Sequence, residues 1–263
     1  EILPEWELNV GLPDEQTHIM EIAYRRAKQL AHARPLMWTA SDRSDLRSRI
    51  AEVIRLPREE AVSWRKIGDA LGDPSTANYE LRVGAMTIPV SVKRGDDTAT
   101  ATLIIDESGR AGHTPPCEYC LAAYPTNAVV ADIFGMGENR CDHRLSMLLE
   151  SAGHRLLGIQ VAQIHACAQL ASELTGAQRV DLAAIGTTAS FACLVAAALK
   201  RELFASLSVA RELTTLTRLI EWGERYENHP SLFCFGLLEV ADVPELRALL
   251  EGMAYIQRFR YVR

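Results

Sequence analysis

The chain has 263 residues, of which 48% are hydrophobic and 24% charged, and its formal net charge is −6. This length suits one α/β domain with an N-terminal extension rather than two complete cores. The acidic balance and the lack of a basic run argue against nucleic acid or an anionic membrane as a partner. No apolar stretch of the sequence is long enough to span a bilayer.

The sequence begins with Glu1, so we expect a processed chain from which any secretion signal has been removed. A soluble secreted or periplasmic protein is compatible with this, and the compartment itself stays open. Three of the six cysteines, Cys167, Cys193 and Cys234, lie in apolar segments and are predicted to be small core residues.

The first third of the chain is predicted to be helical. A first helix over 14–33 would be capped by Asp14 and would bury one apolar face, formed by Ile19, Ile22, Ala23, Ala27 and Leu30. A second helix would begin at Ser44 and stop at Pro57, and a third over 58–71 would turn Trp64 and Ile67 inward. We therefore assign residues 1–77 to a helical N-terminal extension.

From residue 78 onward the pattern predicts alternating strands and helices. Segments 79–83, 87–92 and 98–105 are expected to be antiparallel leading strands, and 127–133 a buried parallel strand. A helix over 154–175 ends at Gly176, and strand 179–185, a helix, strand 203–209, helix 211–226 and a strand within 255–262 follow. This order predicts that residues 78–263 form a mostly parallel, three-layer α/β sheet.

The turn after strand 179–185 carries the strongest chemical signal in the sequence. A strand, a glycine turn and an apolar helix follow one another here, as in the G-x-S-x-G nucleophile elbow of hydrolases. The five elbow positions read Gly186-Thr187-Thr188-Ala189-Ser190, so only the first glycine fits and Thr188 stands at the nucleophile position.

Three further segments, together with the elbow, resemble acetyl-xylan-esterase-like α/β-hydrolases. They are Ala131-Asp132-Ile133-Phe134-Gly135-Met136-Gly137-Glu138, Arg155-Leu156-Leu157-Gly158-Ile159-Gln160-Val161, and the run 235–246, which contains Ala241-Asp242-Val243-Pro244-Glu245-Leu246. The resemblance covers about residues 80–252. It implies an α/β-hydrolase fold, a serine at 188 and a glycine at 190, and a cleft mouth lined by Gly135, Gly137 and Glu138.

The resemblance also implies two more strands after the Ala241–Leu246 helix, carrying a catalytic acid and then a histidine. Because the sequence ends at Arg263, we expect no room for both, and hence a C-terminally truncated sheet with an open edge. Such an edge needs covering, so we expect a second copy of the chain, giving a dimer, or a companion catalytic domain as partner.

Thr188 is expected to be an ordinary residue near the start of its helix, because a β-branched side chain is strained in the backbone conformation of an elbow. Its hydroxyl would then cap backbone N–H groups. The alternative is a nucleophile with His229, the only histidine after it, and Glu224 as the acid. Nothing in the spacing favours that triad.

Cys117 and Cys120 form a C-x-x-C pair, which is typical of zinc or redox sites and also of plain surface cysteines. We expect no metal site there and no cofactor elsewhere. The sequence thus predicts a catalytically degenerate, esterase-like domain with a structural, assembly or ligand-binding role. The alternative is an active carboxylic-ester hydrolase of acetyl-xylan-esterase type, and a small ester or carbohydrate is the expected ligand.

Overall fold

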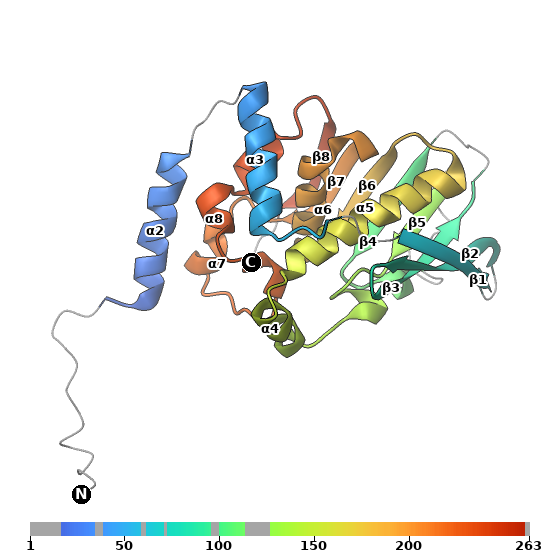
Figure 1. Ribbon diagram of the computed structural model, residues 1–263, viewed down its shortest axis with the longest axis horizontal. Helices are drawn as coiled ribbons and strands as arrows, with labels where there is room; N and C mark the ends of the chain where they lie inside the picture. Colours follow the sequence, from blue (N-terminus) through green and yellow to red (C-terminus); the bar gives the residue numbers. More distant parts are fainter. Residues whose placement is uncertain are drawn as a thin grey trace, which may run out of the picture.

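The fold is organised around one mixed sheet with the strand order β1-β2-β3-β5-β4-β6-β7-β8 (Figure 1). The structure is a computed structural model that describes residues 17–34, 39–58, 62–70, 73–95, 100–113 and 127–260. The strands are β1 Val62–Ala70, β2 Asp73–Val83, β3 Met86–Lys93, β4 Ala101–Asp106, β5 Asn127–Ala131, β6 Val180–Ile185, β7 Phe204–Glu212 and β8 Ala254–Arg260. This mostly parallel sheet with flanking helices confirms the predicted fold class.

The parallel part of the sheet runs from β5 through β4, β6 and β7 to β8. β1, β2 and β3 pair antiparallel in front of it, and β3 joins it antiparallel through β5. The expected strand 98–105 therefore lies inside the parallel part as β4, and not among the antiparallel leading strands, because it pairs with two parallel neighbours.

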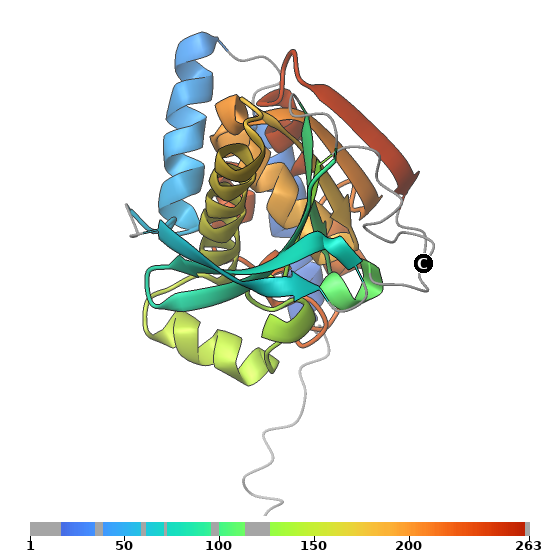
Figure 2. The ribbon, with the colours of Figure 1, turned by 90° about the vertical axis from the view of Figure 1, so that its right-hand side faces the viewer.

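Alternation along the central strands divides apolar residues between the two faces of the sheet. Leu103 of β4, Val129 of β5 and Leu182 of β6 belong to the large core, whereas Ile104, Ala128 and Val130 form a small separate cluster. The large core includes buried residues of the helices α3 (Ala40–Val53), α5 (Leu156–Thr175), α6 (Thr187–Leu199) and α9 (Val243–Ala248). Figure 2 shows α3 and α5 on the same side of the sheet.

The two central helices, α5 and α6, are apolar on nearly all sides, which is typical of helices buried inside a core. α5 ends at Gly176, whose φ of 82° gives the predicted left-handed cap. The three predicted core cysteines, Cys167, Cys193 and Cys234, are all buried. Burial raises the pKa of the Cys167 and Cys234 thiols to about 12, so both stay protonated.

Two predicted helices are wrong, and one observed helix was not predicted. Residues 62–70 of the third expected helix form β1, on which Trp64 and Ile67 are exposed. The expected helix 211–226 is replaced by the end of β7 and the short α7 (Thr217–Glu221). A short helix, α4 (His143–Ser151), was not expected.

The first two helices are confirmed with changed ends and faces. α2 spans Ile19–Ala33, and of its expected inward face Ala27 is buried whereas Ile19 and Ile22 are exposed. The expected cap, Asp14, lies outside the described residues. α3 begins after Thr39, whose capping box with Asp42 precedes the expected start at Ser44.

Candidate functional site

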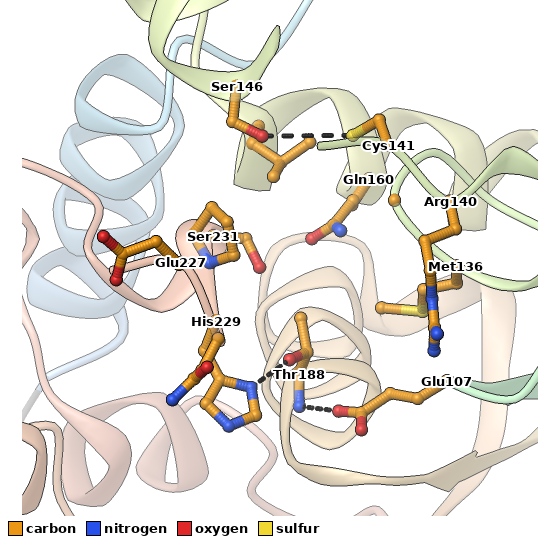
Figure 3. A pocket seen from close by; sticks show the side chains of 14 residues that line it. Glu107, Met136, Arg140, Cys141, Ser146, Gln160, Thr188, Glu227, His229 and Ser231 are labelled. Atoms are coloured by element: carbon orange, nitrogen blue, oxygen red, sulfur yellow. Dashed lines mark hydrogen bonds between the residues drawn. The ribbon is translucent and has the colours of Figure 1, made fainter. Parts of the chain in front are cut away.

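A cavity of about 370 Å³ opens at the carboxyl ends of the parallel strands (Figure 3). Its lining includes Glu107, directly after β4, Gly135, after β5, and Thr188, after β6. His229 and Ser231, from the connection that follows α7, form the opposite wall together with Gln160 of α5. Ligands of open α/β sheets bind at this edge, so the cavity is the candidate site.

Thr188 occupies the second position of α6 and is partly buried. Among the non-glycine residues of the described segments, only Arg55 and Arg211 have a positive φ, so Thr188 does not have the strained backbone of an elbow nucleophile. Gly186 makes the turn instead, with φ 104° and ψ 159°. The expectation of a relaxed turn at Thr188 is therefore met.

We expected the Thr188 hydroxyl to cap a backbone N–H. Instead it lies 2.9 Å from Nδ1 of His229 (Figure 3). The structure thus brings together the two residues of the alternative catalytic hypothesis. Glu224 does not join them, since its Oε1 accepts from Asn228 Nδ2 at 2.7 Å and no hydrogen bond or ion pair links it to His229. Within the described segments, no carboxylate forms a hydrogen bond or ion pair with His229.

Ser190, at the last elbow position, is fully buried and packs at the contact between α6 and β7. Its hydroxyl donates to the carbonyl of Ala210 at 2.7 Å. The same carbonyl accepts from the backbone N–H of Gly186 at 3.3 Å. The extra bulk of serine over glycine is therefore accommodated by a hydrogen bond to the neighbouring strand.

Glu107 lies directly after β4, the neighbour of β6 in the sheet, and its side chain reaches the turn between β6 and α6. Its Oε1 accepts a hydrogen bond from the backbone N–H of Thr188, and the N–H of Ala189 lies 3.4 Å from the same oxygen. Gly186 is required here, since a Cβ at this position would come within 2.6 Å of the Glu107 carboxylate. The N-terminus of α6, where backbone N–H groups favour negative charge, is thus occupied by a side chain of the protein itself.

Two polar atoms on the opposite wall have no partner in the part of the chain that the structure describes. They are Oε1 of Gln160 and Oγ of Ser231, and their side chains are 1% and 2% exposed. Both side chains extend toward the space above Thr188 in Figure 3. Cys141 also lines the cavity, and burial raises the pKa of its thiol above the usual value, which keeps it protonated.

Of the expected cleft-lining residues, only Gly135 borders this cavity. Gly137 and Glu138 do not line it and lie next to the fully buried Asp132. The Asp132 carboxylate accepts from the backbone N–H groups of Arg110 and Glu138 at 2.7 and 3.2 Å, and Glu138 pairs with Arg110 at 2.6 Å. The segment 131–138 therefore holds the loops after β4 and β5 together.

The metal candidates Cys117 and Cys120 lie outside the described residues. Within the described segments, no group of three or more His, Cys, Asp and Glu side chains is arranged to hold a metal ion. No helix in those segments is long and apolar enough to cross a membrane.

The sequence did not identify Glu107, Gln160 or Ser231 as site residues. Glu107 carried a usable signal, because it is an acidic residue directly after an apolar strand that leads to the functional edge of the sheet. Gln160 and Ser231 carried none. One is a polar residue within an apolar helix, and the other lies in a loop whose path only the tertiary structure fixes.

No protein-family model matches the chain, and no curated protein matches it by sequence. Its fold is similar to that of a candidate acetyl xylan esterase from Bacteroides fragilis NCTC 9343, with a TM-score of 0.74 at 12% identity over 95% of this chain and 78% of that one. Acetyl xylan esterase 1 from Thermoanaerobacterium sp. JW/SL YS485 matches with a TM-score of 0.53 at 12% identity, over 89% of this chain and 91% of that one. The Paenibacillus sp. R4 acetyl xylan esterase matches with a TM-score of 0.52 at 11% identity, over 90% and 93% of the two chains. The expected acetyl-xylan-esterase-like α/β-hydrolase fold is thereby confirmed.

Proposed function

We propose that this chain is a catalytically degenerate hydrolase domain that binds a small molecule in the cavity at the end of β6 without hydrolysing it. The observation that carries this proposal is the position of the Glu107 carboxylate on the backbone N–H groups of Thr188 and Ala189. In α/β-hydrolases the N–H of the residue after the nucleophile, here Ala189, stabilises the oxyanion of the tetrahedral intermediate.

A carboxylate in that position opposes ester hydrolysis in two ways. It takes the N–H donors away from the developing oxyanion, and the loss of one such donor costs about 10²–10³ in kcat. It also adds a like charge, and two negative charges about 4 Å apart repel by roughly 1 kcal/mol in water and roughly 4 kcal/mol near a protein surface. Both effects raise the barrier at the step that the fold would otherwise accelerate.

The hydroxyl and its histidine support the same conclusion. Nothing in the described segments orients His229 as a triad carboxylate would, and Thr188 does not have the strained backbone that presents an elbow nucleophile. What remains is a cavity with polar walls at the ligand-binding edge of the sheet. Binding a ligand in this cavity requires neither an oriented histidine nor an elbow nucleophile, whereas catalysis requires both.

The test is hydrolysis of p-nitrophenyl acetate by the native chain and by Thr188→Ala, with far-UV circular dichroism to show that both are folded. We expect the two rates to be equal and close to that of an inert protein. Glu107→Gln, which keeps the shape but removes the charge, separates the two effects of the carboxylate. A native rate that disappears in Thr188→Ala would overturn the proposal.

A second candidate function is carboxylic-ester hydrolysis with Thr188 as nucleophile. The 2.9 Å contact between Thr188 Oγ1 and His229 Nδ1 favours it, since a nucleophile and its base must lie within hydrogen-bond reach. A fluorophosphonate probe distinguishes the candidates. Covalent labelling of Thr188 that is abolished in His229→Gln would support hydrolysis, and an unlabelled native chain would support the proposed binding role.

A further inference from the structure

We propose that the cavity selects a small ligand that donates hydrogen bonds to Gln160 Oε1 and Ser231 Oγ and carries no negative charge. A primary amine and an alcohol share this chemistry. The inference rests on the proposed binding function and names the class of ligand. It is carried by two polar atoms, Gln160 Oε1 and Ser231 Oγ, that have no partner among the described residues. Their side chains are each more than nine-tenths buried and extend into the cavity.

The orientation of the Gln160 amide fixes which of its atoms faces the cavity. Nε2 donates to the backbone carbonyl of Phe134 at 3.0 Å, and Phe134 N–H in turn donates to Oε1 of Gln163 at 2.7 Å. Since a carbonyl accepts only from a donor, the NH₂ group must point to Phe134. The opposite atom, Oε1, therefore faces the cavity as a pure acceptor, and only an N–H or O–H of a ligand can satisfy it.

Two ligand classes are disfavoured by this lining. An ester or acetyl group offers only acceptors, so it leaves Gln160 Oε1 unsatisfied at the cost of its desolvation. An anion meets the carboxylate of Glu107, which already occupies the helix N-terminus where an anion would bind. Arg140 also lines the cavity, but its side chain is exposed, where solvent and salt screen its charge.

No described protein group pairs with these two atoms, so removing either one costs the fold no protein–protein hydrogen bond, which separates a binding role from a structural one. A buried hydroxyl without a partner is unfavourable, so its removal leaves a fold unchanged or makes it more stable. Ser91 provides the matched control. It is also a buried serine, but its hydroxyl donates to Asn78 at 2.8 Å and accepts from Arg110 at 2.8 Å.

The experiment measures binding of four probes with a similar ring, by ligand-observed NMR, to the native chain, Ser231→Ala and Ser91→Ala. The probes are benzylamine, benzyl alcohol, benzoate and methyl benzoate. We expect benzylamine and benzyl alcohol to bind the native chain about tenfold more tightly than the other two, since one satisfied hydrogen bond is worth about this much. The ratio between the amine and the alcohol shows whether the favoured donor is an ammonium or a hydroxyl.

Ser231→Ala should weaken the amine and the alcohol about three- to tenfold, and Ser91→Ala should leave both unchanged. Without ligand, Ser231→Ala should melt at the native temperature or above it, and Ser91→Ala below it. The inference is overturned if no probe binds, if benzoate or methyl benzoate binds as tightly as the amine, or if Ser231→Ala changes melting and not binding. Thr188-dependent ester hydrolysis would refute the proposed function alone, because these binding differences do not depend on turnover.

Discussion

The carboxylate of Glu107 supplies an acceptor to the first turn of α6, where backbone N–H groups have no partner within the helix. A negative charge at this end also interacts favourably with the helix dipole. The Glu107 side chain therefore stabilises this end of the helix, and in the proposed function the same carboxylate opposes hydrolysis.

We expect Glu107→Ala to lower the free energy of unfolding by about 1–2 kcal/mol, the usual cost of losing a helix cap. Glu107→Gln keeps an acceptor and should lose less. Urea denaturation at pH 7 measures both. Glu173, which is exposed in α5 and bonded to Trp64, gives a control in Glu173→Ala, with a change of about 0.5 kcal/mol or less. A Glu107→Ala variant as stable as the native chain would mean that water replaces the carboxylate without loss.

His165 makes the stability of the core depend on pH. Its ring is buried and one nitrogen lies 2.9 Å from the carbonyl of Ala196, and burial lowers its pKa to about 4. In the unfolded chain the ring takes up a proton near pH 6.5, whereas the folded chain does not until about pH 4. Below pH 6.5 the unfolded state therefore binds more protons, and stability falls as the pH falls.

Between pH 7 and pH 5 this single group should remove about 2 kcal/mol from the free energy of unfolding. His165→Gln keeps a donor for the Ala196 carbonyl and does not titrate, so its pH dependence should be flatter by that amount. Urea denaturation of both proteins at the two pH values provides the comparison. Parallel pH profiles would show that the pKa of His165 is not lowered in the fold, because the other titrating groups contribute equally to both proteins.

At the scale of elements, α3 and α5 meet at a glycine. A Cβ at Gly158 would collide with the carbonyl oxygen of Ile54 and lie 3.0 Å from that of Arg55, at the end of α3. Gly158 has no positive φ, so its role is close approach rather than backbone freedom. Close packing thus explains the glycine in segment 155–161, one of the segments that resemble acetyl-xylan-esterase-like α/β-hydrolases.

Gly158→Ala should therefore destabilise the protein by about 1–3 kcal/mol, the usual cost of overpacking a core. Gly68→Ala is the matched control, because no atom lies within 4 Å of a Cβ at that position of β1. Thermal unfolding followed by circular dichroism compares the two. Equal melting temperatures for the two variants would show that α3 moves away from α5 at little cost.

The elements with a strong periodic pattern were predictable from the sequence, and those at the edges were not. α5, β6 and α6 are long or apolar, α5 ends at a glycine and another glycine separates β6 from α6, so local preference and burial agree. β1 is mostly exposed, so no buried face marks its period, and pairing with β2 decides its conformation. The same holds for the end of β7, whose pairing with β8 extends the strand through residues expected to be helical.

The site was predictable in its position and only partly in its chemistry. The strand–turn–helix pattern placed Thr188 at the functional edge, because that pattern depends on neighbouring residues alone. His229 was a candidate merely as the last histidine, and its contact with Thr188 depends on a connection of irregular structure. The partners of Glu107, Gln160 and Ser231 are set by packing between distant segments, which one sequence does not reveal.

At the scale of the whole molecule, the N-terminal helices are bound to the C-terminal half of the chain by arginines that reach backbone carbonyls. Arg47 of α3 donates to the carbonyls of Ala198 and Leu249 at 2.8 and 3.0 Å. Arg34, directly after α2, donates to Leu238 at 2.6 Å and forms an ion pair with Glu245 at 3.2 Å. α2 also packs against α7 and α8 (Leu237–Val240).

These contacts imply that the N-terminal helices and the sheet unfold as one cooperative unit. Arg47→Met keeps much of the side-chain volume but removes both hydrogen bonds, and each hydrogen bond to a charged group contributes about 1.5–3 kcal/mol. We therefore expect a loss of at least about 2 kcal/mol in the free energy of unfolding. Arg49→Met, at an exposed position of the same helix, should change it by about 0.5 kcal/mol or less.

Urea unfolding should be followed by far-UV circular dichroism, which reports all helices, and by tryptophan fluorescence, which reports Trp64 on β1 and Trp222 after α7 among the described residues. If the unit is cooperative, the two signals of Arg47→Met shift together to lower urea with unchanged slope. An early loss of helical signal before the fluorescence changes would instead mean that α2 and α3 detach alone. In that case the cavity, whose lining residues all come from 107 onward, would keep the proposed ligand affinity after the helices are lost.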